Sequence, residues 1–286
     1  MTRAPAMDHP WTAWVGRRES REDLVTAAPL AMLDATLDRE PVAHGPGASV
    51  PPCWHWLYFL PAARASEIGV DGHPRRGGFL PPVELPRRMW AGGRLTFERP
   101  LGVGEIARRD STIVSVERKA GKSGELVFVL VRHEIFGPDG RAVIEEHDIV
   151  YRPAPAPGAA PPTPQPAPAD ARWSFAVEAD AVMLFRYSAL TFNGHRIHYD
   201  KDYALNEEHY PGLVVHGPLL ATWLLELPRR VLPARKVAAF SFRALAPVFG
   251  PTRFTVNGKP EDGGIALWIA DAAGTLAMTA TVGFAT

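Results

Sequence analysis

The chain has little of several features that mark other classes of protein. Its single cysteine, Cys53, excludes an intramolecular disulfide and a cysteine-based metal site, and we expect it to be a small buried residue. Its 31 basic and 31 acidic residues give a formal net charge of +0, which argues against nucleic acid as the main partner. The pairs Gly77-Gly78 and Gly92-Gly93 lack the dinucleotide fingerprint, so neither nicotinamide nor flavin is expected as a cofactor.

Long hydrophobic runs are also missing. The longest strongly apolar run, from Leu219 to Leu227, is interrupted by Thr222 and Glu226 and is far too short to cross a membrane. The N-terminal residues carry several charges and no apolar stretch, so no signal peptide is expected. We therefore expect a soluble, cytoplasmic protein without a membrane partner.

Proline, in contrast, is abundant and unevenly placed. Eight of the 29 prolines lie between Pro153 and Pro168, in a segment with no apolar face to bury. Such a segment is typical of an extended linker with polyproline character. The 286 residues are enough for two small domains with cores of their own. We predict an N-terminal domain at 1–151, a linker at 152–170 and a C-terminal domain at 171–286.

Both predicted domains end in a series of alternating apolar and polar runs. Glycine- and aspartate-rich turns separate these runs, a pattern that predicts antiparallel strands joined as a meander. The two series are weakly similar in residue identity but follow the same order, which indicates an internal duplication. The runs lie at 111–117, 125–135, 142–151, 252–257, 264–270 and 275–284.

Each meander is preceded by a segment with helical spacing of apolar residues. We expect helices at Leu24–Leu37 and at Pro218–Leu227, the second ended by Pro228. The aromatic segment Trp54–Leu60 is interpreted as a buried strand or packing segment, in preference to an aromatic ligand site. A helix followed by a curved antiparallel sheet is the hot-dog pattern. Two copies predict an α+β, double hot-dog fold.

Polar groups that suit catalysis are concentrated in one stretch, Ala189–Asp200. It places an amide, two imidazoles and a guanidinium within a few residues, and His216-Gly217 then opens the second predicted helix. Histidine has a pKa suited to both giving and taking a proton near neutral pH. A backbone N–H at a helix N-terminus can stabilise a developing negative charge.

The same stretch resembles the MaoC-type hydratases and the type 2 hydroxyacyl-thioester dehydratases. It aligns without gaps to their motif A-L-T-G-D-x-N-P-I-H-x-D. The resemblance implies that the family's catalytic histidine is His198 and that its catalytic aspartate is replaced by Asn193. The family's asparagine and proline become His195 and Arg196, and its His-Gly pair becomes His216-Gly217.

Two N-terminal segments, Gly78–Pro82 and Leu85–Gly93, are typical of the bacterial subgroup that hydrates mesaconyl-C4-CoA. The resemblance therefore implies a hydro-lyase that adds water to an α,β-unsaturated acyl-CoA with a second carboxylate. Mesaconyl-C4-CoA (3-methylfumaryl-CoA) would give citramalyl-CoA. No metal and no cofactor are implied, and a homodimer is compatible with the fold.

The chemistry assigns a role to each residue. Because the amide of Asn193 cannot titrate, His198 is expected to act as both base and acid. Asn193 is expected to orient the water. The Gly217 N–H is expected to stabilise the thioester oxyanion. Arg196, helped by His195, is expected to bind the second carboxylate of the substrate. His216 is included among the substrate-binding residues.

Other interpretations stay open at this point. Itaconyl-CoA hydratase and a dehydratase of 3-hydroxyacyl-ACP or 3-hydroxyacyl-CoA would use the same residues. Asn193 also leaves room for a non-catalytic acyl-thioester-binding protein. A thioesterase ranks low because Glu226 lies at the far end of the second helix. Three basic pairs are candidates for binding the CoA phosphates: Arg87-Arg88, Arg229-Arg230 and Arg235-Lys236.

Overall fold

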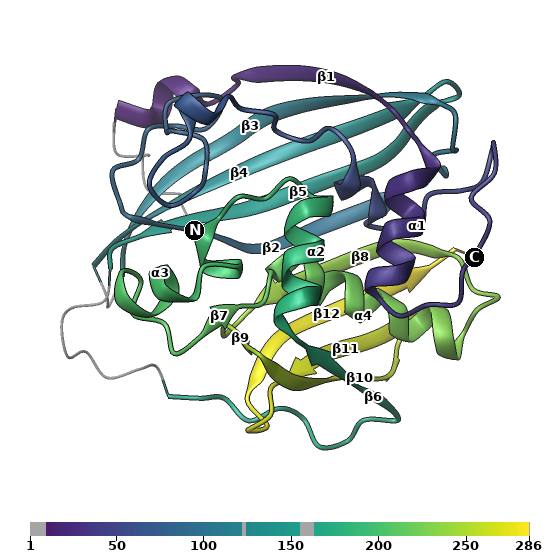
Figure 1. The fold of residues 1–286 in the computed structure, drawn as a ribbon. Coiled ribbons are helices and arrows are strands. Elements are labelled where there is room, and N and C mark those ends of the chain that lie inside the picture. The colour runs from purple at the N-terminus through teal and green to yellow at the C-terminus, as the bar shows by residue number, and fades with distance from the viewer. Residues whose placement is uncertain (1–9, 122–123, 155–162, 286) are drawn as a thin grey trace, which may run out of the picture.

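The computed structural model describes residues 10–121, 124–154 and 163–285 (Figure 1). Within these residues, ten strands form one antiparallel sheet in the order β1-β3-β4-β5-β2-β8-β12-β11-β10-β6. The first half of the chain contributes β1 (Arg18–Leu24), β2 (Arg87–Phe97), β3 (Ile106–Gly121), β4 (Gly124–Gly137) and β5 (Gly140–Arg152). The second half contributes β6 (Trp173–Ala179), β8 (Val237–Ala244), β10 (Thr252–Glu261), β11 (Gly264–Ala270) and β12 (Leu276–Phe284).

The strand order repeats when the sheet is followed inward from its two edges. From one edge it is β1, β3, β4, β5 and β2, and from the other it is β6, β10, β11, β12 and β8. The two series meet where β2 pairs with β8, with Gly93 opposite Phe242. This symmetry supports the duplication inferred from the sequence. The three predicted meander runs of each half lie within strands, except that the last run begins one residue before β12, at Thr275.

The predicted linker is described only in part, because residues 155–162 lie outside the described residues. The C-terminal portion of the linker is hydrogen-bonded to the C-terminal half of the protein. The Leu276 N–H donates to the Gln165 carbonyl at 2.7 Å, and the Ala167 N–H donates to the Gly274 carbonyl at 2.9 Å. β5 ends at Arg152 and β6 begins at Trp173. The domain boundaries at 151 and 171 stay a prediction.

The longest helix, α4 (Gly217–Val231), packs against β6, β10, β11 and β12 of the C-terminal half. The prediction that Pro228 ends this helix is wrong. Proline removes one backbone donor from a helix, but the Leu232 N–H still donates to the Pro228 carbonyl at 2.8 Å. The consecutive residues from Leu219 to Pro228 are all buried, so packing against the sheet outweighs the lost hydrogen bond.

The helix of the N-terminal half, α1 (Ala27–Thr36), is shorter than the predicted Leu24–Leu37 because Leu24 still belongs to β1. It packs beside α2 (Ala181–Leu190) in front of the sheet (Figure 1). The remaining elements are short: η1 (Pro10–Trp14), η2 (Trp54–Leu57), η3 (Ala65–Glu67), η4 (Arg196–His198), α3 (Lys201–Asn206), β7 (Leu213–Val214) and β9 (Phe249–Gly250).

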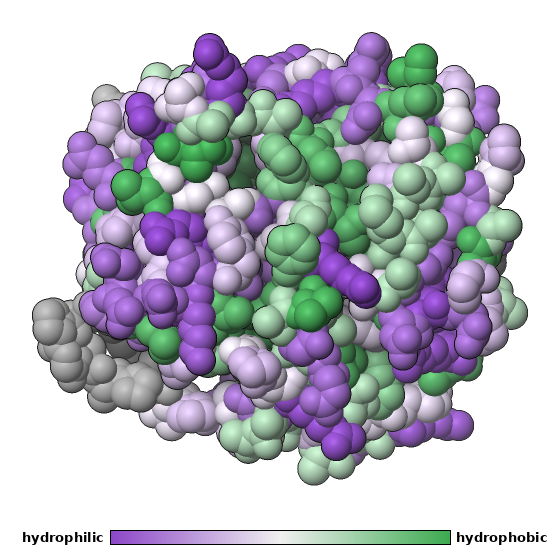
Figure 2. All heavy atoms as spheres, viewed as in Figure 1, coloured by the Kyte–Doolittle hydropathy of each residue, from purple (hydrophilic) through white to green (hydrophobic). Residues whose placement is uncertain are grey.

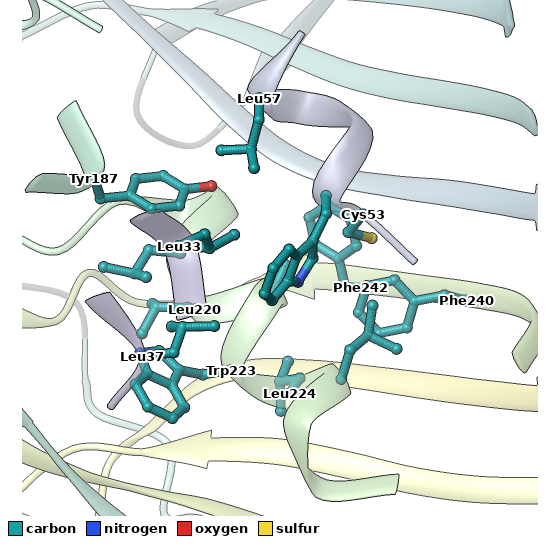
Figure 3. Close-up of a cluster of buried hydrophobic side chains, with 14 of the residues drawn as sticks. Leu33, Leu37, Cys53, Leu57, Tyr187, Leu220, Trp223, Leu224, Phe240 and Phe242 are labelled. Carbon is teal, nitrogen blue, oxygen red and sulfur yellow. The ribbon is translucent and has the colours of Figure 1, made fainter. Parts of the chain in front are cut away.

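One hydrophobic core joins elements from both halves (Figure 3). Leu33 of α1, Tyr187 of α2, Leu224 of α4 and Phe242 of β8 belong to the same buried cluster. Cys53, which precedes η2, is also buried there, as the sequence predicted. The segment Trp54–Leu60 is a packing segment that begins as a 3₁₀ helix and contains no strand. The inner faces of α1 and α2 therefore pack on this shared core.

The outer side of the α1–α2 pair carries an apolar patch, which Figure 2 shows in front of the sheet. Met32 and Phe185 are exposed there. Together with Leu60 they line a groove of about 490 Å³ that also touches Ala189 and Leu190. No helix among the described residues is both long enough and apolar enough to span a membrane.

Candidate active site

The predicted catalytic stretch forms a bend between two helices. The Asp180 carboxylate caps the start of α2 by accepting from the Met183 N–H at 2.7 Å, and Thr191 is the C-cap of the helix. η4 follows, and Asp200 then caps α3 by accepting from the Tyr203 N–H at 3.0 Å. Asp200 is therefore a helix-entry residue, and the bend between the two helices displays the side chains of 193–198.

His198 is held in one defined tautomer. Its Nδ1 lies 2.7 Å from the carbonyl oxygen of Val214, at the end of β7. Since a carbonyl oxygen only accepts, Nδ1 carries the hydrogen and Nε2 keeps its lone pair. Burial lowers the pKa of His198 to about 4, against the raising effect of the Val214 hydrogen bond. The side chain is therefore a neutral imidazole with a free basic nitrogen at neutral pH.

The His216 ring packs against one face of the His198 ring. The two rings stack with centroids 3.7 Å apart and planes 17° from parallel. His216 is completely buried, and its Nε2 lies 2.8 Å from the Ser188 hydroxyl. Burial holds the pKa of His216 well below its ordinary value. The His216 ring has no exposed surface, and its stacking contact is with the His198 ring. Its substrate-binding role stays a prediction.

Gly217 opens α4 directly after His216. No hydrogen-bond acceptor faces the Gly217 N–H within the described residues. A Cβ added to Gly217 would meet no atom within 4 Å, so the space in front of this residue is open. The helix dipole and the unpaired donors of the first turn favour negative charge at such a position. These features support the predicted oxyanion role of Gly217, which stays a prediction.

Asn193 and His195 precede His198 in the same bend. The Asn193 side-chain oxygen accepts the His195 backbone N–H at 3.0 Å, which fixes the amide. The His195 ring meets the His198 ring edge-on at 5.4 Å between centroids. Burial, followed by the charges of His73 and His198, lowers the pKa of His195 to about 2. The structure thus brings Asn193, His195 and His198 together as the sequence predicted.

Two residues that the sequence did not reveal complete this group. His73 packs on His195 with ring centroids 4.0 Å apart, and its Nδ1 lies 3.0 Å from the Asp71 carboxylate. Both residues lie in a loop between η3 and β2. The only signal in the sequence is the short string Asp71-Gly72-His73, which by itself reads as an ordinary turn.

Arg196 is placed differently from its predicted role. Its Nε and Nη2 donate to the Asp200 carboxylate at 2.9 and 2.8 Å, and its Nη1 donates to the Val70 carbonyl at 3.0 Å. Its guanidinium also lies over the Tyr203 ring at 4.1 Å. Binding a substrate carboxylate would require some of these contacts to be exchanged. That role of Arg196 stays a prediction.

Two of the basic residues predicted to bind the CoA phosphates also have carboxylate partners in the protein. Arg87 pairs with Glu208 at 3.4 Å, and Arg229 pairs with Glu226 at 2.6 Å. The same pair occupies Glu226, which weakens a thioesterase interpretation further. The donor atoms of Asp71, His73 and His195 lie within 4.8 Å of one another, which makes them the one candidate metal cluster among the described residues. The direct hydrogen bond between Asp71 and His73 already accounts for two of these donors.

Acid is expected to destabilise the protein through the neutral His198. Its folded pKa of about 4 lies below the value of about 6.5 in an unfolded chain. Its contribution to stability is therefore complete above pH 6.5 and is lost as the pH falls towards 4. For this residue we expect the free energy of unfolding to fall by up to about 1.4 kcal/mol per pH unit. Urea denaturation between pH 7.5 and 5 measures this slope.

Two variants isolate this contribution. His198→Asn removes the titrating group and should flatten the slope. His209→Asn alters an exposed histidine at positive φ, a conformation that asparagine tolerates, and should leave the slope unchanged. Equal slopes for the wild type and His198→Asn would show that this imidazole is not kept neutral by the fold.

Comparisons with known proteins identify the family. Residues 53–250 match the family model described as hydroxyacyl-thioester dehydratase type 2. The chain is 45% identical over 273 residues to the mesaconyl-C(4)-CoA hydratase of Chloroflexus aurantiacus, covering 95% of this chain and 97% of that protein. It is 32% identical over 280 residues to the mitochondrial hydroxyacyl-thioester dehydratase type 2 of Schizosaccharomyces pombe, covering 87% and 91%.

The fold also matches solved structures. A Mycobacterium tuberculosis protein described as having a double hot-dog fold superposes with a TM-score of 0.59 at 14% identity, covering 94% of this chain and 95% of that one. The predicted double hot-dog fold is confirmed, as is the family inferred from the motif. The chain belongs to the type 2 hydroxyacyl-thioester dehydratase family.

Proposed function

We propose that the protein is a hydro-lyase that adds water reversibly to the double bond of mesaconyl-C4-CoA, giving citramalyl-CoA. The relative with this activity in its name aligns over nearly the whole of both chains. The observation that carries the proposal is the fixed tautomer of His198, whose Nδ1–H is bound to Val214. That hydrogen bond leaves Nε2 as a base beside the start of α4.

In the proposed addition, one proton is transferred twice, first from water to His198 and then from His198 to Cα. His198 Nε2 takes a proton from water while the water oxygen bonds to Cβ of the thioester. The electrons of the double bond move towards the thioester oxygen, where the Gly217 N–H stabilises the negative charge. His198 then returns the proton to Cα and is neutral again. This cycle needs no metal and suits an imidazole that begins unprotonated.

The substrate's second carboxylate needs a cation near Cβ. Beyond burial, which is the main cause, the charge of Arg88 also lowers the pKa of His73 and His195. Arg88 therefore brings positive charge from β2 to this end of the site. No carboxylate pairs with Arg88 among the described residues; it hydrogen bonds to Tyr151. Arg88 joins Arg196 as a candidate partner for a dicarboxylic acyl group.

Three alternatives remain to be separated by experiment. Itaconyl-CoA would give the same product, and a 3-hydroxyacyl-ACP or 3-hydroxyacyl-CoA dehydratase would use the same base. A non-catalytic acyl-thioester-binding protein is the alternative from another class. The neutral, tautomer-fixed His198 favours catalysis over binding alone.

Purified protein is expected to hydrate mesaconyl-C4-CoA with a kcat/KM about 100-fold or more above that for crotonyl-CoA. Crotonyl-CoA has no second carboxylate, so it would leave the candidate cations Arg88 and Arg196 without the partner that a dicarboxylic substrate brings. Mass spectrometry of the thioester, with a gain of one water, measures the reaction on mesaconyl-C4-CoA, itaconyl-CoA and crotonyl-CoA. Binding of all three without turnover would replace the enzyme with the thioester-binding protein.

The same assay tests the predicted role of Arg196. Arg196→Leu should narrow the preference for the dicarboxylic thioester if its guanidinium binds the second carboxylate. If the preference is unchanged while the rate falls, Arg196 holds the loop at Val70 instead. Arg88→Met would then be the variant that narrows the preference.

We also propose that the protein acts in the cytoplasm on a free acyl-CoA and forms a homodimer. The formal net charge of +0 supports a small-molecule partner over nucleic acid. The groove between α1 and α2 is apolar, as expected for the uncharged arm of a thioester. Size-exclusion chromatography with light scattering measures the oligomeric state.

A further inference from the structure

The family's catalytic carboxylate is missing at Asn193, and the structure offers a replacement from the other half of the chain. An amide can hold a water but cannot carry the negative charge that a carboxylate brings to it. The Asn193 oxygen is moreover used by the His195 N–H. Asp71, in the N-terminal half, forms a cluster with His73 and His195, whose ligand atoms all lie within 4.8 Å of one another.

Loop 69–73 carries this carboxylate and forms a small closed turn. The Gly69 N–H donates to the His73 carbonyl at 2.7 Å, and Ile68 bridges to Pro74. Gly72 has a φ of +87°, a conformation that favours glycine. The turn therefore has a defined shape of its own, with Val70, Asp71 and Gly72 at its tip.

The tip of this loop is fastened to the catalytic stretch. The Arg196 backbone N–H donates to the Asp71 carbonyl at 2.9 Å, and Arg196 Nη1 donates to the Val70 carbonyl at 3.0 Å. A Cβ on Gly72 would lie 1.8 Å from the Gly194 carbonyl oxygen, so the two backbones touch. Three contacts thus fix loop 69–73 against residues 194–196.

Within the loop, Asp71 fixes the tautomer of His73. One carboxylate oxygen accepts the His73 backbone N–H at 3.0 Å, and the other lies 3.0 Å from His73 Nδ1. Although burial alone would raise it, these hydrogen bonds hold the pKa of Asp71 below its ordinary value. An ionised carboxylate only accepts, so Nδ1 carries the hydrogen and Nε2 is left as an acceptor.

We propose that His73, oriented by Asp71, is the second water-binding group of the active site and takes the part of the carboxylate absent at Asn193. His73 packs on His195, which in turn meets His198. This inference rests on the proposed function. His73 is thus a second catalytic residue beside His198, since it binds the reacting water, and Asp71 is a positioning residue that makes the His73 acceptor stronger.

The step balances without a change in the charge of His73. One hydrogen of the water passes to His198 Nε2 as the oxygen bonds to Cβ. The other hydrogen stays on that oxygen and is held by His73 Nε2. The double-bond electrons move to the thioester oxygen, and His198 returns its proton to Cα. Both imidazoles end neutral, and the product hydroxyl keeps the hydrogen that His73 had bound.

Steady-state kinetics of four variants test the proposal, beside the wild type and with mesaconyl-C4-CoA, itaconyl-CoA and crotonyl-CoA. His73→Ala is expected to lower kcat by on the order of 100-fold with KM nearly unchanged. Asp71→Asn should lower kcat by about 10-fold. His209→Asn is the matched control at an exposed histidine and should retain wild-type kcat. Thermal unfolding of each variant reports whether it is folded.

Rescue separates catalysis from loop support. Asn193→Asp restores a carboxylate beside His195, and in the Asp71→Asn background it should recover about 10-fold in kcat. No structural role of Asp71 predicts that recovery.

Three outcomes would overturn the proposal: kcat of His73→Ala within threefold of wild type, no recovery in the double variant, or activity abolished by a chelator and restored by Zn²⁺. If the wild type hydrates none of the three thioesters, the proposed function fails too; otherwise only this inference falls.

Discussion

His198→Gln is expected to lower kcat/KM for thioester hydration by about 10⁴-fold, the upper range for removal of a general acid–base. The residue is asked to take a proton from water and to return it to carbon. Its Nδ1 is committed to Val214 at 2.7 Å, so only Nε2 can do this work. Glutamine can fill the space and keep a hydrogen bond, but it cannot accept and return a proton.

The kinetic signature of this loss is specific. Because the side chain acts on the water and on Cα, KM should change little while kcat carries the effect. His209→Asn gives the background effect of losing an exposed imidazole. If His198→Gln kept more than about a tenth of wild-type activity, a different residue would have to be the base, and the tautomer argument would lose its functional meaning.

The local parts of this site could be predicted from the sequence. Asn193, His195 and His198 lie within one short bend, so a motif places them together wherever the domain folds. The start of α4 at Gly217 also follows from local signals, a glycine and a proline before an apolar run. The alternating runs predicted the strands for the same reason, because a half-buried strand has a period of two.

The non-local parts could not be predicted. Asp71 and His73 lie far earlier in the chain than His195, and only the fold brings them together. The contacts of Arg196 with Val70 and Tyr203, which come from a distant loop and a following helix, could not be predicted either. The rule that a proline ends a helix considers only neighbouring residues in the sequence. It could not take into account the burial of α4 against the sheet, which carries the helix past Pro228.

The two halves of the duplicated fold contribute different parts to this site. The C-terminal half supplies the bend, the long helix and His198, the proposed base. The N-terminal half supplies loop 69–73, and its sheet is anchored to the core by a separate buried charge, that of Glu145 on β5. Glu145 lies opposite Leu95 of β2, one strand away from the β2–β8 pairing that joins the two halves.

Glu145 is the centre of that buried group. Its carboxylate accepts from His55 Nε2 at 2.9 Å and from Trp56 Nε1 at 2.8 Å, and it lies 2.5 Å from His147 Nε2. Only 2% of the residue is exposed. Although burial alone would raise it, the charges of His147 and His55 hold the pKa of Glu145 well below its ordinary value. The carboxylate is thus ionised and fully partnered inside the protein.

Glu145→Ala is expected to lower the free energy of unfolding by about 3–5 kcal/mol, because it leaves buried donors without an acceptor. Glu146→Ala is the matched control, since successive strand residues point to opposite faces. Glu146 pairs with Arg94 and Arg132, whose side chains are nearly half exposed, so its loss should cost about 1 kcal/mol or less. Chemical denaturation at pH 7.5 measures both. Equal losses for the two variants would mean that η2 is held to the sheet by apolar packing and that the Glu145 hydrogen bonds contribute little.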